Sequence, residues 1–380
     1  MKTRFNFPTR ILFGEGVIED MPPHLSAMGV KRPLVVTDRG LMTTDIPEKL
    51  VNLLRSSGFE PATFYKIDPN PNDQQVEAGT ETFRNHEADG LVAIGGGSPL
   101  DAAKAIQIRI NHPDPLEEYD DLKGGDARIL GELPPLVAIP TTAGTGSEVS
   151  RSAVITVAAA GRKVVLFSPR LMPALAVCDP LLTYELPPRL TAETGMDALS
   201  HNIEAFMATG YHPLADGIAL RAVSMIVRAL PRAVKQGDDA DARRDMLMAS
   251  TMGAVAFQKG LGVVHSLAHP LSTVSGVSHG LANSILLPVA VEFNGEAEAE
   301  RAAELAHALE AQSPTAAAAA ESIRQLARGI GLPLRLSQAG VKEEHLPQLV
   351  AKALEDGCHL SNPRACDDPE TMEQLYRGAW

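Results

Sequence analysis

Hydrophobic residues in the first half of the chain follow two different spacings. The runs at 34–37, 91–94 and 136–139 (LVVT, LVAI and LVAI) are short, rich in β-branched residues and bounded by glycine, proline or charged residues. Such runs are typical of buried parallel strands. Helical patterns lie between them, at 46–57 and 75–86. Strands separated by helices predict a doubly wound, Rossmann-like α/β domain.

The pattern changes near Pro180. After DPLLTYELPPRL, at 179–190, the chain is almost wholly helical in pattern and is punctuated by single prolines and glycines. In its alanine-rich stretch, Ser313 with Pro314 predicts a helix start, and the alanines that follow favour a packed surface helix over a linker. We therefore expect an α/β domain at 1–182 and an all-helical domain at 183–380.

Charge and composition exclude several classes of protein. The formal charge is −13, from 34 lysines and arginines against 47 aspartates and glutamates, which opposes nucleic-acid binding because phosphates are repelled. No segment reaches the ~18 apolar residues that a membrane span needs, and the first residues lack an apolar signal core. The three cysteines are widely spaced and predict neither disulfides nor a CxxC metal site. These features predict a cytoplasmic protein.

Five side chains that can bind a metal lie in two short segments of the second half. Asp197 and His201 are four residues apart in GMDALSHNIEAF, and His265 and His269 repeat this spacing in LGVVHSLAHPLSTVSGVSHG. In a helix, this spacing puts both side chains on one face. His279 follows beyond a turn. Imidazoles and a carboxylate suit Fe²⁺ or Zn²⁺, although a lone histidine in an apolar helix is more often a core residue.

A glycine-rich turn follows the run at 91–94. Gly95, Gly96, Gly97 and Ser98 lead into the helix-forming PLDAAKAIQI. Bare backbone N–H groups and the positive end of a helix together suit a pyrophosphate. The segment matches neither GxGxxG nor a P-loop, so a tight turn without a ligand is the alternative.

A second loop of small and hydroxylated residues, PTTAGTGSE at 140–148, follows the run at 136–139. Its side chains can bond to phosphate or ribose, or to one another. Two such loops at the carboxyl ends of strands favour a dinucleotide. Asp38, directly after the run at 34–37, would accept from the 2′-hydroxyl of the adenosine ribose and repel a 2′-phosphate. This favours NAD over NADP, although the neighbouring Arg39 weakens the inference.

Six motifs, in order along the chain, resemble those of the iron-containing (group III) alcohol dehydrogenase family: GGGSPLDAAKA, PTTAGTGSEV, DPLLTYELPP, GMDALSHNIEAF, the GLGVVHSLAHPL…HG pair and the terminal NPR. The resemblance covers essentially the whole chain. It implies an N-terminal dinucleotide-binding domain, a C-terminal all-helical domain that holds the metal, and a cleft between them for hydride transfer, an architecture shared with dehydroquinate synthases. It also implies a homodimer or higher homo-oligomer.

The resemblance further implies roles for individual residues. The metal ligands it implies are Asp197, His201, His265 and His279. His269 matches a histidine that lies close to the metal without binding it, and we expect it to act in catalysis by relaying a proton. The residues implied to bind NAD are Gly96, Gly97, Ser98, Asp101, Thr141, Thr142, Thr145, Asn70 and Lys163. Lys163 could otherwise be a solvated lysine at a strand edge.

Departures from the family motifs gather on the expected substrate side. Ser272 and Thr273 stand where relatives often have glycine and a small residue, and Val289 replaces a polar or aromatic residue. Phe257 also matches a position that faces the substrate. The resemblance therefore leaves the identity of the substrate open while the ligand set is complete.

These observations predict an NAD-dependent dehydrogenase. Fe²⁺, or alternatively Zn²⁺, would bind the oxygen of a primary alcohol or small hydroxy compound while hydride passes to the nicotinamide and the aldehyde or ketone forms. One alternative is a metal-independent reductase of the maleylacetate reductase type, which the complete ligand set disfavours. Another is a non-catalytic nucleotide or metal binder, which would not need both an anion-binding turn and a metal site.

Overall fold

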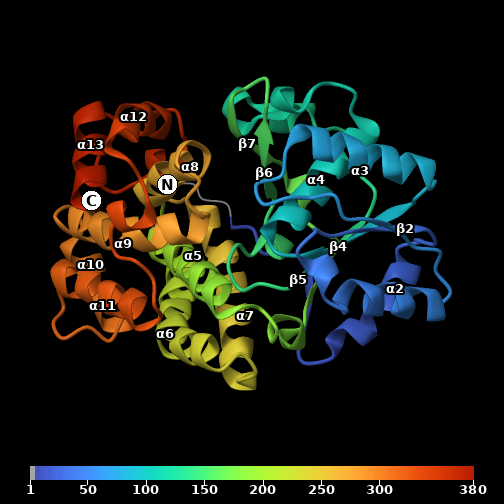
Figure 1. Ribbon diagram of the computed structural model, residues 1–380, viewed down its shortest axis with the longest axis horizontal. Helices are drawn as coiled ribbons and strands as arrows, with labels where there is room; N and C mark the ends of the chain where they lie inside the picture. The colour runs from blue at the N-terminus through green and yellow to red at the C-terminus, as the bar shows by residue number, and fades with distance from the viewer. Residues whose placement is uncertain (1–4) are drawn as a thin grey trace. The chain divides into compact units, whose positions relative to one another are not determined.

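The structure, a computed structural model, describes residues 5–380 (Figure 1). By its internal contacts the chain divides into two units. An α/β unit comprises Pro8–Thr142 and Gly146–Thr183, and a helical unit comprises Tyr184–Trp380 with Ala143–Thr145 and the described residues before Pro8. The division into domains at 1–182 and 183–380 stays a prediction, and by contacts the short segment Ala143–Thr145 groups with the helical unit.

The α/β unit is built on a six-stranded parallel sheet with the order β1-β8-β5-β4-β2-β3. The predicted runs form three neighbouring strands at its centre, which confirms the α/β class. The strands of this sheet are β1 (Arg10–Phe13), β2 (Pro33–Val36), β3 (Ala62–Phe64), β4 (Gly90–Gly95), β5 (Leu136–Pro140) and β8 (Leu175–Cys178).

Both faces of the central strands are buried, which explains why their sequences are uniformly apolar. Along β2, Leu34 and Val36 pack into one hydrophobic cluster and Val35 into another. The first cluster includes apolar residues of α3 (Asp73–Asn85) and α4 (Gly97–Asn111), and the second includes those of α1 (Met21–Ala27) and α2 (Ile46–Ser56). The helices predicted at 46–57 and 75–86 are therefore α2 and α3.

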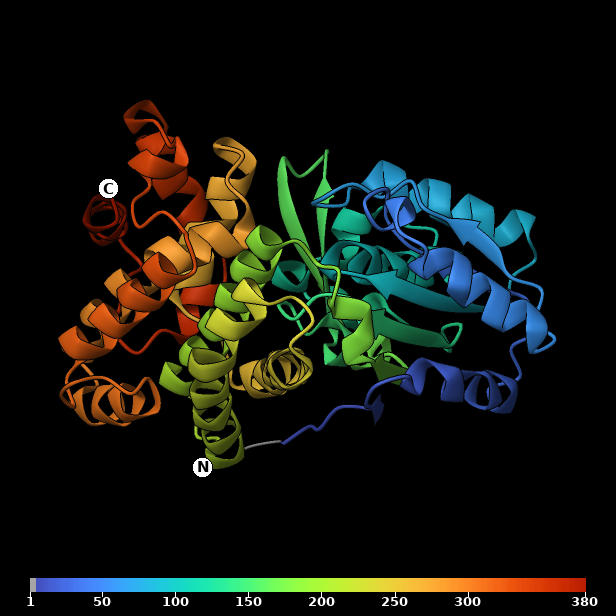
Figure 2. The ribbon, with the colours of Figure 1, turned by 60° about the horizontal axis from the view of Figure 1, so that its bottom comes forward.

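A separate antiparallel ribbon, not predicted from the sequence, joins β6 (Ser152–Val157) to β7 (Arg162–Phe167). Figures 1 and 2 both show this green ribbon projecting away from the main sheet. Alternate residues of β6 are buried, because only one face of the ribbon packs against the unit. Thr156 pairs with Lys163 in its register.

The second unit is helical throughout, as expected. Its α-helices are α5 (Pro188–Met207), α6 (Pro213–Lys235), α7 (Ala240–Ala256), α8 (Val263–Val274), α9 (His279–Gly295), α10 (Ala299–Ala308), α11 (Ala316–Gly329), α12 (Leu346–Leu354) and α13 (Pro369–Gly378). Helix α5 is buried along most of its length, so it forms the core of the unit.

The start of α11 differs from the prediction. Thr315 rather than Ser313 is the N-cap, because its side chain accepts a hydrogen bond of 3.2 Å from the backbone N–H of Ala318. The alanine-rich stretch then forms a helix that buries Ala319, Ala320 and Ile323. The prediction of a packed helix is confirmed, and only its cap was wrong.

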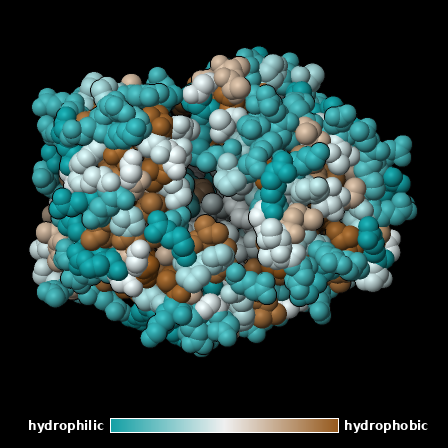
Figure 3. Space-filling view, in the orientation of Figure 1, coloured by the Kyte–Doolittle hydropathy of each residue, from teal (hydrophilic) through white to brown (hydrophobic). Residues whose placement is uncertain are grey.

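The sequence predicts no membrane span. Within residues 5–380, no single helix has the length and apolar composition to cross a membrane, and one pair, Ala240–Lys259 with Val263–Val274, meets those criteria only when joined across a 112° bend. The face seen in Figure 3 is mostly hydrophilic, with apolar residues in small separate patches.

Candidate metal and cofactor sites

Helix α5 places Asp197 and His201 on one face. The two residues are one helical turn apart, both are buried, and Nε2 of His201 lies 3.9 Å from Oδ1 of Asp197. Proline residues at the start of α5 set its first turn, and good helix formers follow. The spacing of four residues therefore places Asp197 and His201 on one face of a helix, as predicted.

Helices α8 and α9 bring two further histidines to the same carboxylate. His265 lies in the first turn of α8, and His279 is the first residue of α9. Their Nε2 atoms lie 3.9 Å and 3.4 Å from Oδ1 of Asp197. Three imidazole nitrogens thus surround one carboxylate oxygen, although the residues come from segments far apart in the sequence.

The four predicted ligands are not equally close to one another. Ligand atoms of Asp197, His265 and His279 all lie within 4.8 Å of each other, and His201 is outside that mutual group. The His201 ring stacks on that of His265 at 4.7 Å between centroids, and its Nδ1 lies 3.3 Å from the carbonyl oxygen of Gly144. His201 therefore lies next to the three-residue group, and its role as a fourth ligand stays a prediction.

The geometry fits a divalent cation. Ligand distances of about 2.1 Å in a tetrahedral arrangement require donor atoms about 3.4 Å apart, close to the spacings of 3.4 Å and 3.9 Å around Asp197. Within the described chain, Nε2 of His265 is buried and has no hydrogen-bond partner. A buried polar atom without a partner is costly, and an ion bound to Nε2 would remove that cost.

Glu204, one helical turn after His201, was missed by sequence reasoning. Its carboxylate accepts a short hydrogen bond from Nδ1 of His265 and a second bond, of 2.7 Å, from the backbone N–H of Val264. Because a carboxylate can only accept, Nδ1 of His265 carries the hydrogen and Nε2 has its lone pair available. The helical spacing puts Glu204 on the same face of α5 as His201, but it does not predict the contact with His265.

The two buried histidines respond differently to their surroundings. Burial lowers the pKa of His201 below its usual value, and Asp197 only partly offsets this effect. Burial opposes the charged form of His265 as well, but the Glu204 carboxylate outweighs it and raises the pKa of His265. The neutral form is therefore more favoured at His201 than at His265, where an ion at Nε2 would compete with a second proton that the Glu204 charge stabilises.

Gly280 permits the close approach that brings His279 to Asp197. A Cβ atom at this position would lie 2.1 Å from the carbonyl oxygen and 2.6 Å from the carbonyl carbon of Glu193 on α5. No side chain fits between these backbones. The glycine next to His279 is thus required by the packing of α9 against α5, which sequence spacing alone does not reveal.

Asn283 is a further member of the site that was not predicted. Its amide nitrogen donates to Oδ1 of Asp197 at 2.7 Å and lies 3.2 Å from Nε2 of His279. It lies one turn after His279 on α9. The lone pairs of both candidate ligands therefore converge on one electropositive group, as they would on a cation.

His269, the expected proton relay, is held by an aspartate from a distant segment. Nδ1 of His269 lies 2.7 Å from Oδ2 of Asp356. Burial would raise the pKa of Asp356, but the charge and hydrogen bond of His269 outweigh it and hold that pKa well below its usual range. Asp356 was not predicted, and it fixes the orientation of the His269 ring, which stacks on that of His279 at 5.2 Å.

In the α/β unit, the glycine-rich turn is a strand-to-helix junction. Strand β4 ends at Gly95, Gly96 is the N-cap of α4, and Gly97 and Ser98 form the first turn of this 15-residue helix. No side chain caps the helix start, so its first N–H groups and positive dipole are available to an anion. Binding of a pyrophosphate by these residues stays a prediction.

Asp38 follows β2 at the same edge of the sheet. Its Oδ1 accepts from the backbone N–H of Leu41 at 2.8 Å, and its Oδ2 lies 3.0 Å from where a Cβ on Gly95 would be. Asp38 is therefore next to the glycine-rich turn. Arg39, whose proximity weakened the prediction for NAD, bonds through Nε to Oδ1 of Asp68 at 3.0 Å.

Asp101 has a different setting from the one expected of a cofactor contact. Its Oδ1 accepts from Oγ of Ser147 at 2.6 Å, and its Oδ2 accepts from the N–H of Val154 at 3.0 Å. It thus ties α4 to the second loop and to β6. Lys104, which was not predicted, is fully buried and donates to the carbonyl oxygens of Ser147 and Ser152 at 2.7 Å and 2.8 Å.

The remaining predicted cofactor residues are more dispersed. Thr141 follows β5, and its N–H donates to the carbonyl oxygen of Gly95 at 2.9 Å, while Thr142 lies against Gly96. Thr145 groups with the helical unit.

The other two predicted cofactor residues lie outside these loops. Asn70 is exposed in the turn before α3 with a φ of 59°. Lys163 is half-buried on β7, and its charge lowers the pKa of Asp101, although burial dominates and raises it.

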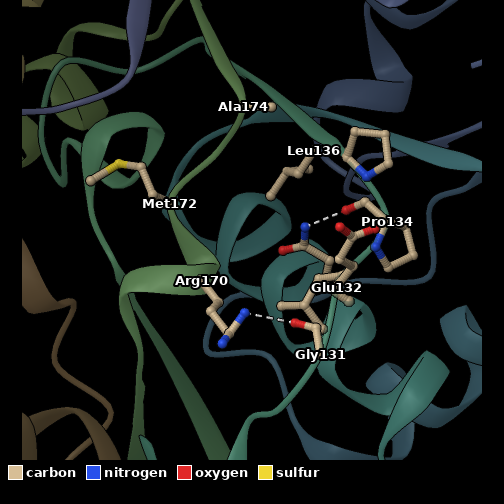
Figure 4. A pocket seen from close by; sticks show the side chains of 10 residues that line it. Gly131, Glu132, Pro134, Leu136, Arg170, Met172 and Ala174 are labelled. Atoms are coloured by element: carbon tan, nitrogen blue, oxygen red, sulfur yellow. Dashed lines mark hydrogen bonds between the residues drawn. The ribbon is translucent and has the colours of Figure 1, made fainter. Parts of the chain in front are cut away.

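A surface pocket of about 270 Å³ lies elsewhere in the α/β unit, near the amino ends of β5 and β8 (Figure 4). Arg170 at its rim donates to the carbonyl oxygen of Gly131 at 2.8 Å, and Gln107 donates to that of Pro134. No predicted cofactor or metal residue lines it. The chemistry is therefore expected at the two sites described above, not in this pocket.

Comparison with known proteins identifies the family. The model of the iron-containing alcohol dehydrogenase family matches residues 8–180, and that of the Fe-containing alcohol dehydrogenase family C-terminal domain matches residues 191–380. A 4-hydroxybutyrate dehydrogenase of Cupriavidus necator is 40% identical over 96% of this chain and 98% of its own. An NAD-dependent methanol dehydrogenase of Bacillus methanolicus is 39% identical over 99% of this chain and 100% of its own.

Solved structures agree with these matches. The crystal structure of a 1,3-propanediol oxidoreductase superposes with a TM-score of 0.94 at 37% identity, covering 100% of both chains. Both family models and the full-length relatives support one assignment. The chain belongs to the iron-containing alcohol dehydrogenase family, and it is accordingly an NAD-dependent alcohol oxidoreductase of a class that uses a divalent metal.

Proposed function

We propose that the protein interconverts a short, linear primary alcohol and its aldehyde, using NAD. The relatives named for 4-hydroxybutyrate, methanol and 1,3-propanediol support this substrate class, because each of these compounds carries a terminal hydroxyl on a short unbranched chain. In the oxidation, the alcohol carbon loses a hydride to NAD⁺ and the alcohol oxygen loses a proton. Aldehyde, NADH and one proton are formed.

The single observation that carries the proposal is the convergence of three imidazole Nε2 atoms on Oδ1 of Asp197. We infer that Asp197, His201, His265 and His279 hold one divalent cation, Fe²⁺ or Zn²⁺. When bound, the ion supplies Lewis acidity toward the alcohol oxygen and so favours loss of its proton. Glu204 keeps the hydrogen of His265 on Nδ1, so that Nε2 can bind the ion. Gly280 allows the close packing of α9 against α5 that brings His279 to the site.

His269 is proposed to move the proton. Its Nδ1 hydrogen is directed to Asp356, which leaves Nε2 as the atom that accepts a proton and returns it to solvent. Because Asp356 stays ionised over the working pH range, it stabilises the imidazolium that forms. This is a positioning role, since no part of Asp356 needs to contact the reactants.

The α/β unit is proposed to bind the dinucleotide. The N–H groups of Gly97 and Ser98 at the start of α4 would hold the pyrophosphate, with Gly96 allowing its close approach, and the Asp38 carboxylate would accept from the ribose 2′-hydroxyl. Thr141, Thr142, Thr145, Asn70 and Lys163 remain proposed contacts. For Asp101 we propose a supporting role, because its bonds to Ser147 and Val154 join α4 to the second loop and to β6.

A substrate panel tests the proposed class. Monoalcohols, α,ω-diols and ω-hydroxy acids of matched chain length are offered at fixed NAD⁺, and kcat/KM is taken from NADH formation. Each methylene that fits the pocket should change the selectivity by about 1–3 kcal/mol, which gives a clear optimum of chain length and terminal group. Preference for secondary or branched alcohols over all linear primary ones would reject the proposal.

We also propose that the chain works as a homodimer or larger homo-oligomer in the cytoplasm, as the family resemblance implies. Its acidic composition supports a protein without nucleic-acid partners. Light scattering on the eluate of a size-exclusion column gives the mass directly. A single species at the 40.4 kDa of one chain, at working concentration, would reject the oligomer.

A further inference from the structure

A second cluster of side chains that can bind a metal includes the proposed proton relay, His269. It combines His269 of α8 with Asp356 and Cys358, which follow α12. One ligand atom from each residue lies within 4.8 Å of the other two, and all three side chains are half-buried. Each side chain thus keeps part of its surface exposed, and the cluster shares no residue with the Asp197 group.

Hydrogen bonds hold the carboxylate in place before any ion arrives. Oδ1 of Asp356 accepts from Oγ of Ser266 and from the backbone N–H of Cys358, both at 2.8 Å, while Oδ2 faces Nδ1 of His269 at 2.7 Å. The N–H of His359 in turn donates to Oγ of Ser266 at 2.9 Å. A preorganised ligand loses little freedom on binding, which favours affinity.

The donor types differ from those of the first site. One nitrogen, one oxygen and one sulfur form a three-ligand set that suits Zn²⁺ or a softer ion and leaves a position for water. The Asp197 site contains no sulfur, so it has no such preference. We propose that His269, Asp356 and Cys358 form a second cation site selective for thiophilic divalent ions such as Zn²⁺, and that its occupation inhibits alcohol oxidation.

Charge balance allows this ion to bind next to an occupied first site. A dication between the Asp356 carboxylate and the Cys358 thiolate is neutralised, since two negative charges cancel two positive ones. Repulsion from a neighbouring cation is therefore small compared with that between two bare dications. This site was not predicted, because Cys358 has no second cysteine at CxxC spacing.

The inhibition would follow from a shift of the hydrogen of His269 from one ring nitrogen to the other. When the ion binds, the Cys358 thiol releases its proton to solvent and the S–H bond is replaced by an S–metal bond. The neutral imidazole of His269 binds through Nδ1, so its hydrogen moves to Nε2. His269 can then no longer accept a proton at Nε2. This last step rests on the proposed function of His269, whereas the binding of the ion does not.

Metal stoichiometry tests the site directly. Protein is saturated with Zn²⁺, freed of excess metal by gel filtration and analysed by atomic absorption, for the native chain, Cys358→Ala and Cys358→Ser. Cys366→Ala is the matched control, since Cys366 is a free thiol of the same terminal segment that belongs to neither ligand group. The native chain and the control should each bind one more equivalent of Zn²⁺ than either Cys358 variant.

Cobalt gives a second readout that does not depend on activity. Co²⁺ added in place of Zn²⁺ should produce a thiolate-to-metal charge-transfer absorption in the native chain and in Cys366→Ala, and not in Cys358→Ala. With alcohol as substrate, half-inhibition by Zn²⁺ should require at least about tenfold more metal in Cys358→Ala. Equal stoichiometry and equal spectra in the native and Cys358→Ala proteins would overturn the proposal.

The outcomes separate this site from the proposed function. If the extra equivalent and the cobalt band depend on Cys358 but no alcohol is oxidised, the second site stands and the proposed function fails. If alcohol is oxidised while the native chain binds a single ion and shows no thiolate band, the second site is rejected and the proposed function stands.

Discussion

Nδ1 of His265 donates to the Glu204 carboxylate, while Nε2 of the same ring lies 3.9 Å from Oδ1 of Asp197. The two nitrogens therefore have separate tasks. Glu204 determines which nitrogen carries the hydrogen, and Asp197 lies where a shared ion would bind. A residue that touches no ion thus controls whether His265 can be a ligand.

Replacing Glu204 with glutamine should weaken metal binding by about 10–100-fold. The carboxylate accepts from both His265 Nδ1 and the N–H of Val264, and an amide cannot accept with both of its heteroatoms. Affinity is measured by competition with a chelator. Glu292→Gln is the control, because Glu292 on α9 pairs with Arg324; equal losses in both variants would contradict the role of Glu204.

Gly280→Ala should both destabilise the helical unit and reduce metal affinity. The new methyl group would overlap the backbone of Glu193, and overpacking of this kind costs about 1–3 kcal/mol or more. Separation of α9 from α5 would also move His279 away from Asp197. Chemical unfolding and metal titration provide the two measurements.

Gly217→Ala on α6 is the matched control for that change, since no atom lies within 4 Å of its added Cβ. Alanine is favoured over glycine in a helix by about 1 kcal/mol. The control should therefore be neutral or stabilised, with unchanged metal affinity. A Gly280→Ala protein that behaves in the same way would show that the close contact is not required.

Asp38→Asn should relax the preference for NAD. The amide still accepts from the N–H of Leu41, but the charge that repels a 2′-phosphate is gone. We expect the ratio of kcat/KM for NADP to that for NAD to rise about tenfold, which corresponds to about 1.4 kcal/mol. Asp45→Asn, an exposed charge paired with Lys49, should leave the ratio unchanged; a rise in both variants would indicate a general effect of net charge.

Lys104 should make stability rise with pH in alkaline solution. Burial lowers its pKa from 10.5 to about 8, so between these values the unfolded chain holds a proton that the folded chain has released. Stability then increases as pH rises through this window, by about 3 kcal/mol in total. The free energy of unfolding is compared with that of Lys104→Met at several pH values. Parallel curves for the two proteins would contradict the shifted pKa.

The fold could be predicted largely because the signals that define it are local. The three central strands are buried on both faces and therefore read as continuous apolar runs, as at Leu91–Ile94, and the helices between them have their own periodicity. The β6–β7 ribbon was not predicted because its strands are only half-buried and so lack the continuous burial of the central strands. The cap of α11 was placed two residues early, since Ser313 and Thr315 are both good N-caps.

The site was predictable only in part, because most of its contacts join segments that are distant in the sequence. The spacing of Asp197 and His201 fixes a helix face, but the approach of α8 and α9 to that face depends on tertiary packing. Glu204 contacts His265 from 61 residues away and Asp356 contacts His269 from 87 residues away. No local pattern encodes such separations. The role of Gly280 likewise depends on a helix that is distant in the sequence.

The central claim is that one cation held around Asp197 is required for alcohol oxidation. Its most direct test removes the metal with a chelator, verifies its absence by elemental analysis, and follows NADH formation from a short primary alcohol before and after Fe²⁺ or Zn²⁺ is returned. Activity should be lost with the metal and restored on its return in the native chain, and it should not be restored in His265→Ala. Full activity in the verified metal-free protein would contradict the claim.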